Sequence, residues 1–383
     1  MKNVSRGAVP PVQLTPVSAI TLTVLCCLAL CGVITAQSDE AISPPPPTVA
    51  VHPQFGGQIL GFGVDQGGTE GLLSEYVSEA GGNNLVATEV FDQSTGNIIR
   101  VLAMRDHTMD DYVTEGVVGN HIGLELYQQV VNGVVHNYFF TINPLSTNRF
   151  TGIWTPTIQN GYQLWGLTLN QGSPKMAVLQ ATLEGSPYMY LYNTNVATNT
   201  FGPLVSYNNP NIGCCPGFAY DTKLNVAMLA GSNGSPTTPP ILATINLATG
   251  AVHELTGLGV GTVNGLAIDP FSDNAVFTTQ GGPFVPPFVE FYNLNSHTQN
   301  ALRLPGGNIG GDVEYDSLHR LFIVSASDGF NNSILEYDTL GNLKQVLTGG
   351  ALNNLLTCCE LNPTTRTGFG LGHGLTTLQS FSY

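Results

Sequence analysis

Two pairs of adjacent cysteines, Cys214-Cys215 and Cys358-Cys359, are the most unusual chemical feature of this sequence. A disulfide between neighbours would be strained, because bonded cysteines normally have Cα atoms about 4.4–6.8 Å apart and neighbours lie at ~3.8 Å. Such a bond would give a rigid apolar plate for a ligand. The alternatives are a link or a soft-metal site between the two pairs, or thiols that pack as small hydrophobic groups. The sequence leaves all three open.

Two carboxylates lie in segments that we expect to form inner strands, close to a central channel. Glu314 stands between Val313 and Tyr315, and Glu360 follows the second cysteine pair. A carboxylate beside a channel can titrate unusually or hold a cation, although a solvated channel-lining side chain is the simpler interpretation. The candidate binding residues at the channel mouth are therefore Cys214, Cys215, Cys358, Cys359, Glu314 and Glu360.

Familiar catalytic and cofactor motifs are missing from the sequence. The eight histidines show no metal-type spacing, and no Walker loop, Gly-x-Ser-x-Gly elbow or His-Glu-x-x-His is present. The acidic stretch from Asp106 to Glu115 lacks the alternating spacing and central glycine of an EF-hand. We therefore predict no catalytic residue, no metal ligand and no cofactor, with a divalent cation as a possibility. An enzyme is the less favoured reading.

Composition narrows the class of protein. Hydrophobic residues make up 42% of the 383 residues and charged residues only 10%, while glycine and proline are abundant, which is typical of a compact all-β fold. The formal net charge is −15. Nucleic-acid binding requires a basic footprint, so we expect no such partner. The negative charge favours cations or basic proteins as ligands.

The N-terminus predicts export. Lys2 and Arg6 precede the apolar run Val17–Ile34, and Ala36 offers a small-residue cleavage point, so we interpret residues 1–36 as a signal peptide or signal anchor. A Pro-rich linker follows at 37–47, and residues 48–383 form the folded part. We expect a secreted, extracellular or membrane-anchored cell-surface protein, in which disulfides are permitted. Asn233 and Asn331 begin glycosylation sequons that apply only in a eukaryotic host.

Two interleaved patterns repeat at intervals of about 50 residues. In one, an apolar strand ends in Asp or Asn before a turn, and in the other an alternating strand leads into a turn rich in Thr and Gly. The first pattern is centred on Asp65, Asn120, Asn170, Asp221, Asp269, Asp316 and Asn362. The second is centred on Asp92, Asn143, Asn193, Asn246, Asn293 and Asp338. A short apolar strand lies between them, so that each unit contains four strands.

Four-stranded units at this period predict the blades of a β-propeller. We expect an all-β fold with seven blades, and six blades with a C-terminal appendage as the alternative. The last unit contains only three strands, and the segment Thr48–His52 could supply the fourth and close the ring. We expect contact surfaces at the segment Gly67–Asn84 and the Pro-rich loop Gly281–Phe288.

The inner-strand endings Ile268-Asp269-Pro270 and Leu361-Asn362-Pro363, with the turn Asp92–Gly96, resemble the broad NHL, YVTN and lactonase-type propellers. This resemblance implies a propeller fold, and the superfamily includes enzymes, electron-transfer proteins and binding modules, so fold does not choose function. We expect a monomeric binding or scaffold module for a protein, glycan or small-molecule ligand. The alternative is a lactonase-like hydrolase that uses a divalent cation at the channel mouth.

Overall fold

The computed structural model describes most residues between Val49 and Tyr383. The predicted signal segment 1–36 and linker 37–47 lie outside the described residues. No helix able to cross a membrane occurs within the described ranges. These ranges are 49–78, 84–107, 112–119, 122–131, 134–142, 150–154, 162–169, 173–182, 188–198, 200–209, 212, 217–231, 241–255, 262–280, 287–305, 309–328, 330–349, 352, 355–372 and 374–383.

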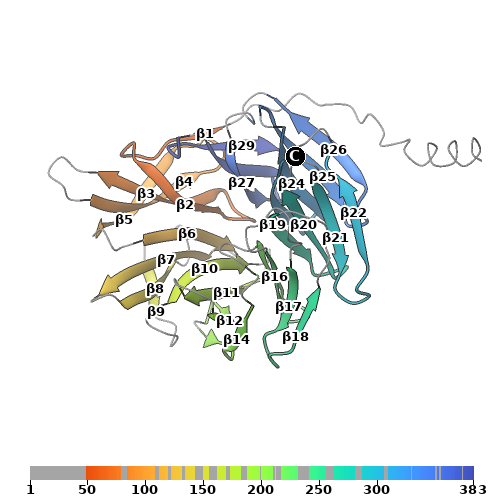
Figure 1. The fold of residues 1–383 in the computed structure, drawn as a ribbon. Coiled ribbons are helices and arrows are strands. Elements are labelled where there is room, and N and C mark those ends of the chain that lie inside the picture. Colours follow the sequence, from red (N-terminus) through yellow and green to blue (C-terminus); the bar gives the residue numbers. More distant parts are fainter. Residues whose placement is uncertain are drawn as a thin grey trace, which may run out of the picture. The chain divides into compact units, whose positions relative to one another are not determined.

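The chain folds into short antiparallel strands that follow one another in sequence (Figure 1). The first units contain β2 (Gln58–Val64), β3 (Glu70–Ser78), β4 (Asn84–Asp92) and β5 (Ile98–His107), then β6 (Tyr112–Gly119), β7 (Ile122–Val131), β8 (Val134–Ile142) and β9 (Phe150–Trp154). The third contains β10 (Tyr162–Leu169), β11 (Lys175–Thr182), β12 (Tyr188–Asn195), β13 (Thr200–Phe201) and β14 (Val205–Asn208), with β13 and β14 both paired to β12.

The remaining strands repeat this order. They are β15 (Gly217–Asp221), β16 (Val226–Gly231), β17 (Ile241–Asn246) and β18 (Val252–Leu255), then β19 (Thr262–Asp269), β20 (Asn274–Gln280), β21 (Phe288–Asn293) and β22 (Gln299–Arg303). After these come β23 (Ile309–Asp316), β24 (Leu321–Ser327), β25 (Asn332–Asp338) and β26 (Leu343–Thr348), and finally β27 (Leu355–Asn362), β28 (Thr367–Gly372) and β29 (Leu378–Ser382).

The strands form a β-propeller, as the repeat predicts. Hydrogen bonding groups them into six sheets, whereas the sequence predicts seven blades. The difference arises in one eight-stranded sheet, which contains the units β19–β22 and β23–β26. A single pairing between Gln280 of β20 and Ile309 of β23 joins the two units.

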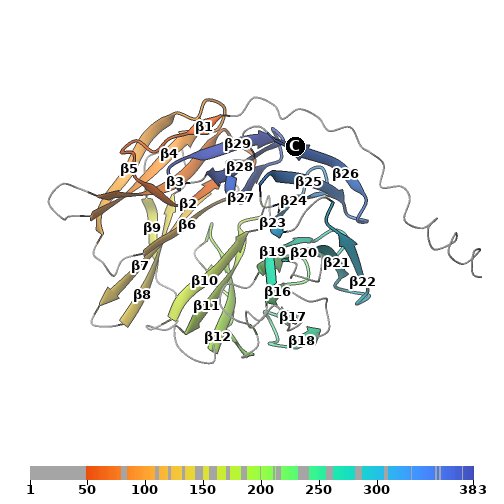
Figure 2. The same cartoon turned by 45° about the horizontal axis from the view of Figure 1, so that its top comes forward.

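The first strands of successive units lie next to one another around the ring (Figure 2). Contacts run from β2 to β6, β10, β15, β19, β23 and β27, and β27 also contacts β2. The hydrophobic core is divided between neighbouring units. For example, Phe322 and Val324 of β24 pack with Val276 and Val289 of the preceding unit, so each unit buries its apolar face against the next.

The predicted closing strand is confirmed. β1 (Ala50–Val51) pairs with β29 through Ala50–Gln379 and Val51–Leu378. The last unit therefore takes its fourth strand from the beginning of the folded chain. Val51 is fully buried beside Phe369 and Leu378 of that unit and Ile59 of the first one.

A β-bulge recurs in the first strand of many units. Register shifts occur at Ile59/Gly61, Thr114/Gly116, Leu164/Gly166 and Val263/Gly265, and each bulge ends in a glycine four residues before the Asp or Asn of the repeat. A Cβ atom on Gly265 would lie 2.5 Å from the Cα atom of Asp312 on the next first strand. Glycine therefore permits the close approach of the innermost strands.

Candidate functional site

The innermost strands β23 and β27 carry the predicted site residues that the structure describes. Glu314 lies in β23 and Glu360 in β27, and both side chains are half-buried. Each already has an interaction partner within the protein. Because β23 and β27 lie side by side, the structure places both carboxylates on neighbouring strands at the centre of the ring.

The cysteine pairs are only partly described. Cys214 and Cys215 lie outside the described residues, as does the side chain of Cys358, whose backbone belongs to β27. Cys359 is buried and disulfide-bonded. Its partner lies outside the described side chains, so a bond to its neighbour and a link between the pairs both stay predictions.

Asp312 joins the two strands and was not predicted. Its Oδ1 accepts the backbone N–H of Val313 at 2.9 Å, and its Oδ2 accepts the N–H of Cys359 in β27 at 3.2 Å. Asp312 stands four residues before Asp316, which is the position of the recurring glycine, and Cys358 holds the same position before Asn362. The sequence signal for this site is therefore the replacement of a recurring glycine by Asp312 in one unit and by Cys358 in the next.

The arrangement at the centre can recognise charge. Asp312, Glu314 and Glu360 are all half-buried on two adjacent strands, beside a cysteine that is disulfide-bonded. Half-buried carboxylates interact more strongly with cations than fully exposed ones do. Among the described residues, no group of three or more His, Cys, Asp and Glu side chains is placed to hold a metal ion.

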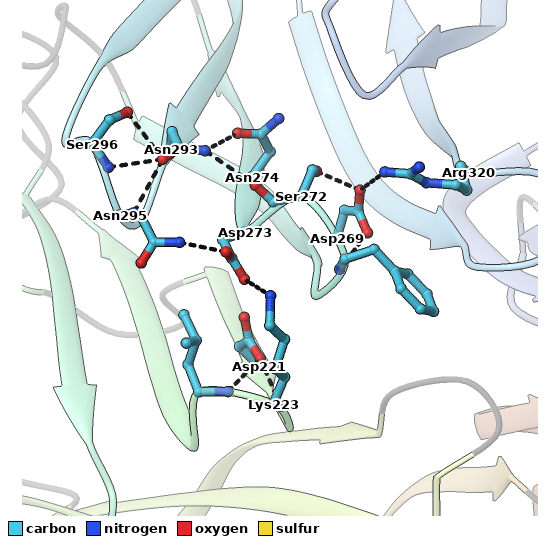
Figure 3. A network of polar contacts seen from close by, with 12 residues as sticks. Asp221, Lys223, Asp269, Ser272, Asp273, Asn274, Asn293, Asn295, Ser296 and Arg320 are labelled. Carbon is cyan, nitrogen blue, oxygen red and sulfur yellow. Dashed lines mark hydrogen bonds and ion pairs between the residues drawn. The ribbon is translucent and has the colours of Figure 1, made fainter.

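A second polar network links the turns of adjacent units (Figure 3). Asp221 accepts the N–H groups of Lys223 and Leu224 at 2.8 and 2.9 Å, and the Lys223 ammonium reaches Asp273 of the next unit at 2.9 Å. Burial raises the pKa of Asp221. The buried carboxylate thus shapes its own turn while the lysine bridges to the neighbouring unit.

The same pattern continues one unit further. Asp269 is fully buried and accepts the N–H of Phe271 at 2.8 Å and the hydroxyl hydrogen bond of Ser272, and Arg320 of the next unit approaches its Oδ2 at 3.3 Å (Figure 3). Burial raises the pKa of Asp269, but these hydrogen bonds outweigh it and hold the pKa below its usual value. We interpret this network as structural, because its donors and acceptors shape turns and join units.

A buried carboxyl pair in the first unit was missed by the sequence reasoning. Glu75 of β3 and Glu89 of β4 are both fully buried. Burial raises the pKa of Glu89 to about 7, against a lowering by the Gln54 N–H and with a further increase from the neighbouring Glu75. The available signal was a glutamate, Glu89, in the mostly apolar strand that leads to Asp92.

Two histidines that are far apart in sequence come together. The rings of His253 in β18 and His297, in the turn after β21, have centroids 4.5 Å apart. The Nδ1 atom of His297 is hydrogen-bonded to the Tyr292 hydroxyl at 2.6 Å. Sequence spacing could not reveal this pair, because the two residues belong to different units.

The structure describes only one of the two glycosylation sequons. Asn233 is outside the described residues. Asn331 is exposed in the turn before β25, where its side-chain amide donates to Asp328 at 3.1 Å.

Comparison with known proteins adds no family to this geometry. No protein-family model matches the sequence, and no curated protein matches it. The structure therefore supports the β-propeller fold that the resemblance implies, and it supports no particular propeller family.

Proposed function

We propose that this protein is a binding module whose innermost strands recognise a positively charged group of a ligand or partner protein. The observation that carries the proposal is the hydrogen bond from Cys359 to Asp312. It ties the disulfide-bonded residue of β27 to the strand that also carries Glu314. A rigid, partly buried acidic surface at the centre of a ring is suited to selective binding.

Charge supports a cationic ligand. The formal net charge is −15, and several of the basic side chains are already used inside the protein. Lys223, Arg320, Lys344 and Arg366 all form ion pairs with neighbouring carboxylates. The long-range field therefore attracts cations and repels anions.

We propose seven blades for the ring. The units β19–β22 and β23–β26 each have a complete ladder of four antiparallel strands, and only one position of strand pairing joins their ladders. If they count as separate blades, the six sheets contain seven units, six with four strands and one with five, in which β13 and β14 both pair with β12. A relation to NHL, YVTN or lactonase-type propellers belongs to this proposal as well.

We also propose that the protein is exported and monomeric. Support for export comes from the basic and apolar N-terminal segment, and from Cys359, whose disulfide requires an oxidising compartment in most organisms. In a eukaryotic host, Asn233 and Asn331 would then be glycosylation sites.

The test uses a fluorescent hexalysine peptide as the probe for a cationic group. We expect Glu314→Gln and Glu360→Gln each to weaken its binding to the full propeller by about tenfold or more, as loss of one half-buried charge contact would. Asp92→Asn is the matched control, because it removes one charge from an outer turn and keeps the oxygen that shapes it. Equal losses in all three variants would reduce the effect to net charge and refute a central site.

The alternative function is a hydrolase that opens lactones with a divalent cation at the channel mouth. Its support is the group of carboxylates on β23 and β27 together with the fold resemblance. Turnover of a simple γ-lactone that requires Ca²⁺, and that Glu314→Gln abolishes, would replace the binding proposal with this one. We expect no such turnover.

A further inference from the structure

The loop that follows the closing strand joins the last unit of the ring to the first. β1 pairs with β29, and β2 begins at Gln58, so the connection between them is the segment 52–57. Gly56 has a φ angle of +72°, which favours glycine. A Cβ atom on Gly57 would lie 1.9 Å from the carbonyl oxygen of Tyr76. The loop therefore fits closely against β3 and leaves no room for a side chain at Gly57.

Two buried carboxyl groups hold this loop through its backbone. Glu75 accepts the N–H groups of Phe55, at 3.2 Å, and Gly57. Glu89 Oε2 accepts the N–H of Gln54 at 3.1 Å. Three N–H donors of one short loop are thus satisfied by two carboxyl groups, and no secondary structure competes for them.

The pair has one oxygen atom in excess of its donors. Glu89 Oε1 is buried and has no hydrogen-bond partner among the described residues. Burial is the main cause of the raised pKa of Glu89, and the neighbouring Glu75 carboxyl raises that pKa further by charge and by hydrogen bonding. One proton held between the two carboxyl groups satisfies the buried oxygen and removes the repulsion between two like charges.

Few other charged groups face the pair. Arg100 on β5 is paired with Glu70 at 2.6 Å, and no basic side chain contributes to the pKa of Glu89. The other titratable residues on the packed elements are Tyr76 on β3, Asp92 at the end of β4, Arg105, Asp106 and His107 on β5, Tyr112 and Glu115 on β6, His52 after β1, and Glu360 on β27. Glu75 is accordingly the charged group that acts on Glu89.

We propose that Glu75 and Glu89 form a proton-dependent clasp, which holds the loop Gln54–Gly57 and thereby the closing strand β1 against the first unit. With one proton on the pair, the clasp is closed. When that proton is lost, two buried negative charges repel each other, and release of the loop exposes them to water.

The direction of the pH effect follows from this linkage. Burial and Glu75 raise the pKa of Glu89 to about 7 in the closed state, and release into water would return it towards its ordinary value of 4.5. The closed state therefore binds more protons between these values, so its advantage is complete below the lower pKa and declines as pH rises towards 7. Above pH 7 both states have lost the proton and the opening equilibrium levels off.

Hydrogen exchange of the loop amides measures the clasp. After correction for intrinsic rates, we expect opening at Gln54, Phe55 and Gly57 to increase by roughly 50-fold between about pH 5 and pH 8. In Glu89→Gln, a neutral amide can donate to Glu75 at every pH, so protection should be high and independent of pH. In Glu75→Gln, two N–H groups lose their carboxylate acceptor, so protection should fall across the whole range.

Glu290→Gln is the control for a general effect of buried glutamates. Burial also raises the pKa of Glu290, but its carboxyl accepts from Gln299 in β22, far from the loop in sequence. This variant should keep the pH dependence of the unmodified protein at residues 54–57. The clasp is refuted if the unmodified loop shows no pH-dependent opening, or if Glu89→Gln retains it.

Discussion

The hydroxyl of Tyr383 donates a hydrogen bond to Oδ2 of Asp316 at 3.1 Å. Asp316 is fully buried at the end of β23, and Tyr383 follows β29 in the next unit. The same carboxylate accepts the N–H groups of Leu318 and His319 at 2.9 Å each. One aspartate therefore both shapes its turn and joins two neighbouring units.

Replacement of Tyr383 by Phe tests this joint. Removal of the hydroxyl takes one hydrogen-bond donor away from the buried Asp316 carboxylate. We therefore expect the free energy of unfolding to fall by about 1–2 kcal/mol. Tyr337→Phe is the matched control, because the Tyr337 hydroxyl is buried and has no hydrogen-bond partner among the described residues. Its loss should be neutral or slightly stabilising in urea unfolding. Similar losses in both variants would contradict the role given to the Asp316 contact.

The two members of the Asp269–Arg320 pair should differ in importance. Asp269 is fully buried and holds its own turn, whereas the Arg320 side chain is 51% exposed. We expect Asp269→Ala to cost about 2–4 kcal/mol, because the Phe271 N–H and the Ser272 hydroxyl lose their acceptor and a fully buried side chain is removed. Arg320→Ala should cost less than about 1 kcal/mol, as a largely exposed ion pair would. Chemical denaturation of both variants checks the order, and a larger loss for Arg320→Ala would contradict it.

The close approach of the innermost strands predicts a steric effect at Gly265. An added Cβ atom would lie 2.5 Å from both the Cα atom of Asp312 and the backbone nitrogen of Val313. We expect Gly265→Ala to destabilise the fold by about 3 kcal/mol or more, because backbone cannot move aside as a flexible side chain can. Thermal unfolding at a fixed pH is the measurement. A midpoint within error of the unmodified protein would show that the strands can separate without cost.

The bulge in β27 bears on the pairing of Cys359. In a regular strand, neighbouring side chains point to opposite faces, but the register shifts between Cys358 and Glu360. We therefore predict a bond between Cys358 and Cys359. Non-reducing peptide mapping by mass spectrometry should find it within one peptide that contains both residues. A peptide linked to Cys214 or Cys215 would establish the cross-link instead, and alkylation of every cysteine would exclude both.

The repeat allowed much of the fold to be predicted. The buried aspartates Asp221, Asp269 and Asp316 end first strands as expected, because their side chains satisfy the N–H groups of the turn that follows. The closing strand was predicted from a missing fourth strand in the last unit. The number of sheets was not, because one residue pair between β20 and β23 merges two units, and periodicity carries no information about such a contact.

The candidate site was predicted less completely. Glu314 and Glu360 lie on first strands as predicted, because the repeat locates those strands in the sequence, and their role in binding stays a prediction. Asp312 was missed because its role depends on β27 of the next unit, and the pair Glu75–Glu89 was missed because its role depends on the loop that packs over it. Burial and partners across a seam are properties of packing, and the local pattern of residues does not encode them directly.

By itself, the sequence determined the strands, the turns and the period, because hydrophobic alternation and Asx chemistry act over a few residues. Only the tertiary structure decided that Asp312 reaches the Cys359 amide and that Glu75 and Glu89 meet at the closing loop. These contacts form only when neighbouring strands and units pack together, which places Asp312 against β27 and the closing loop against Glu75 and Glu89. Their energies depend on desolvation and on the distance between charges, and both are set by the closed ring.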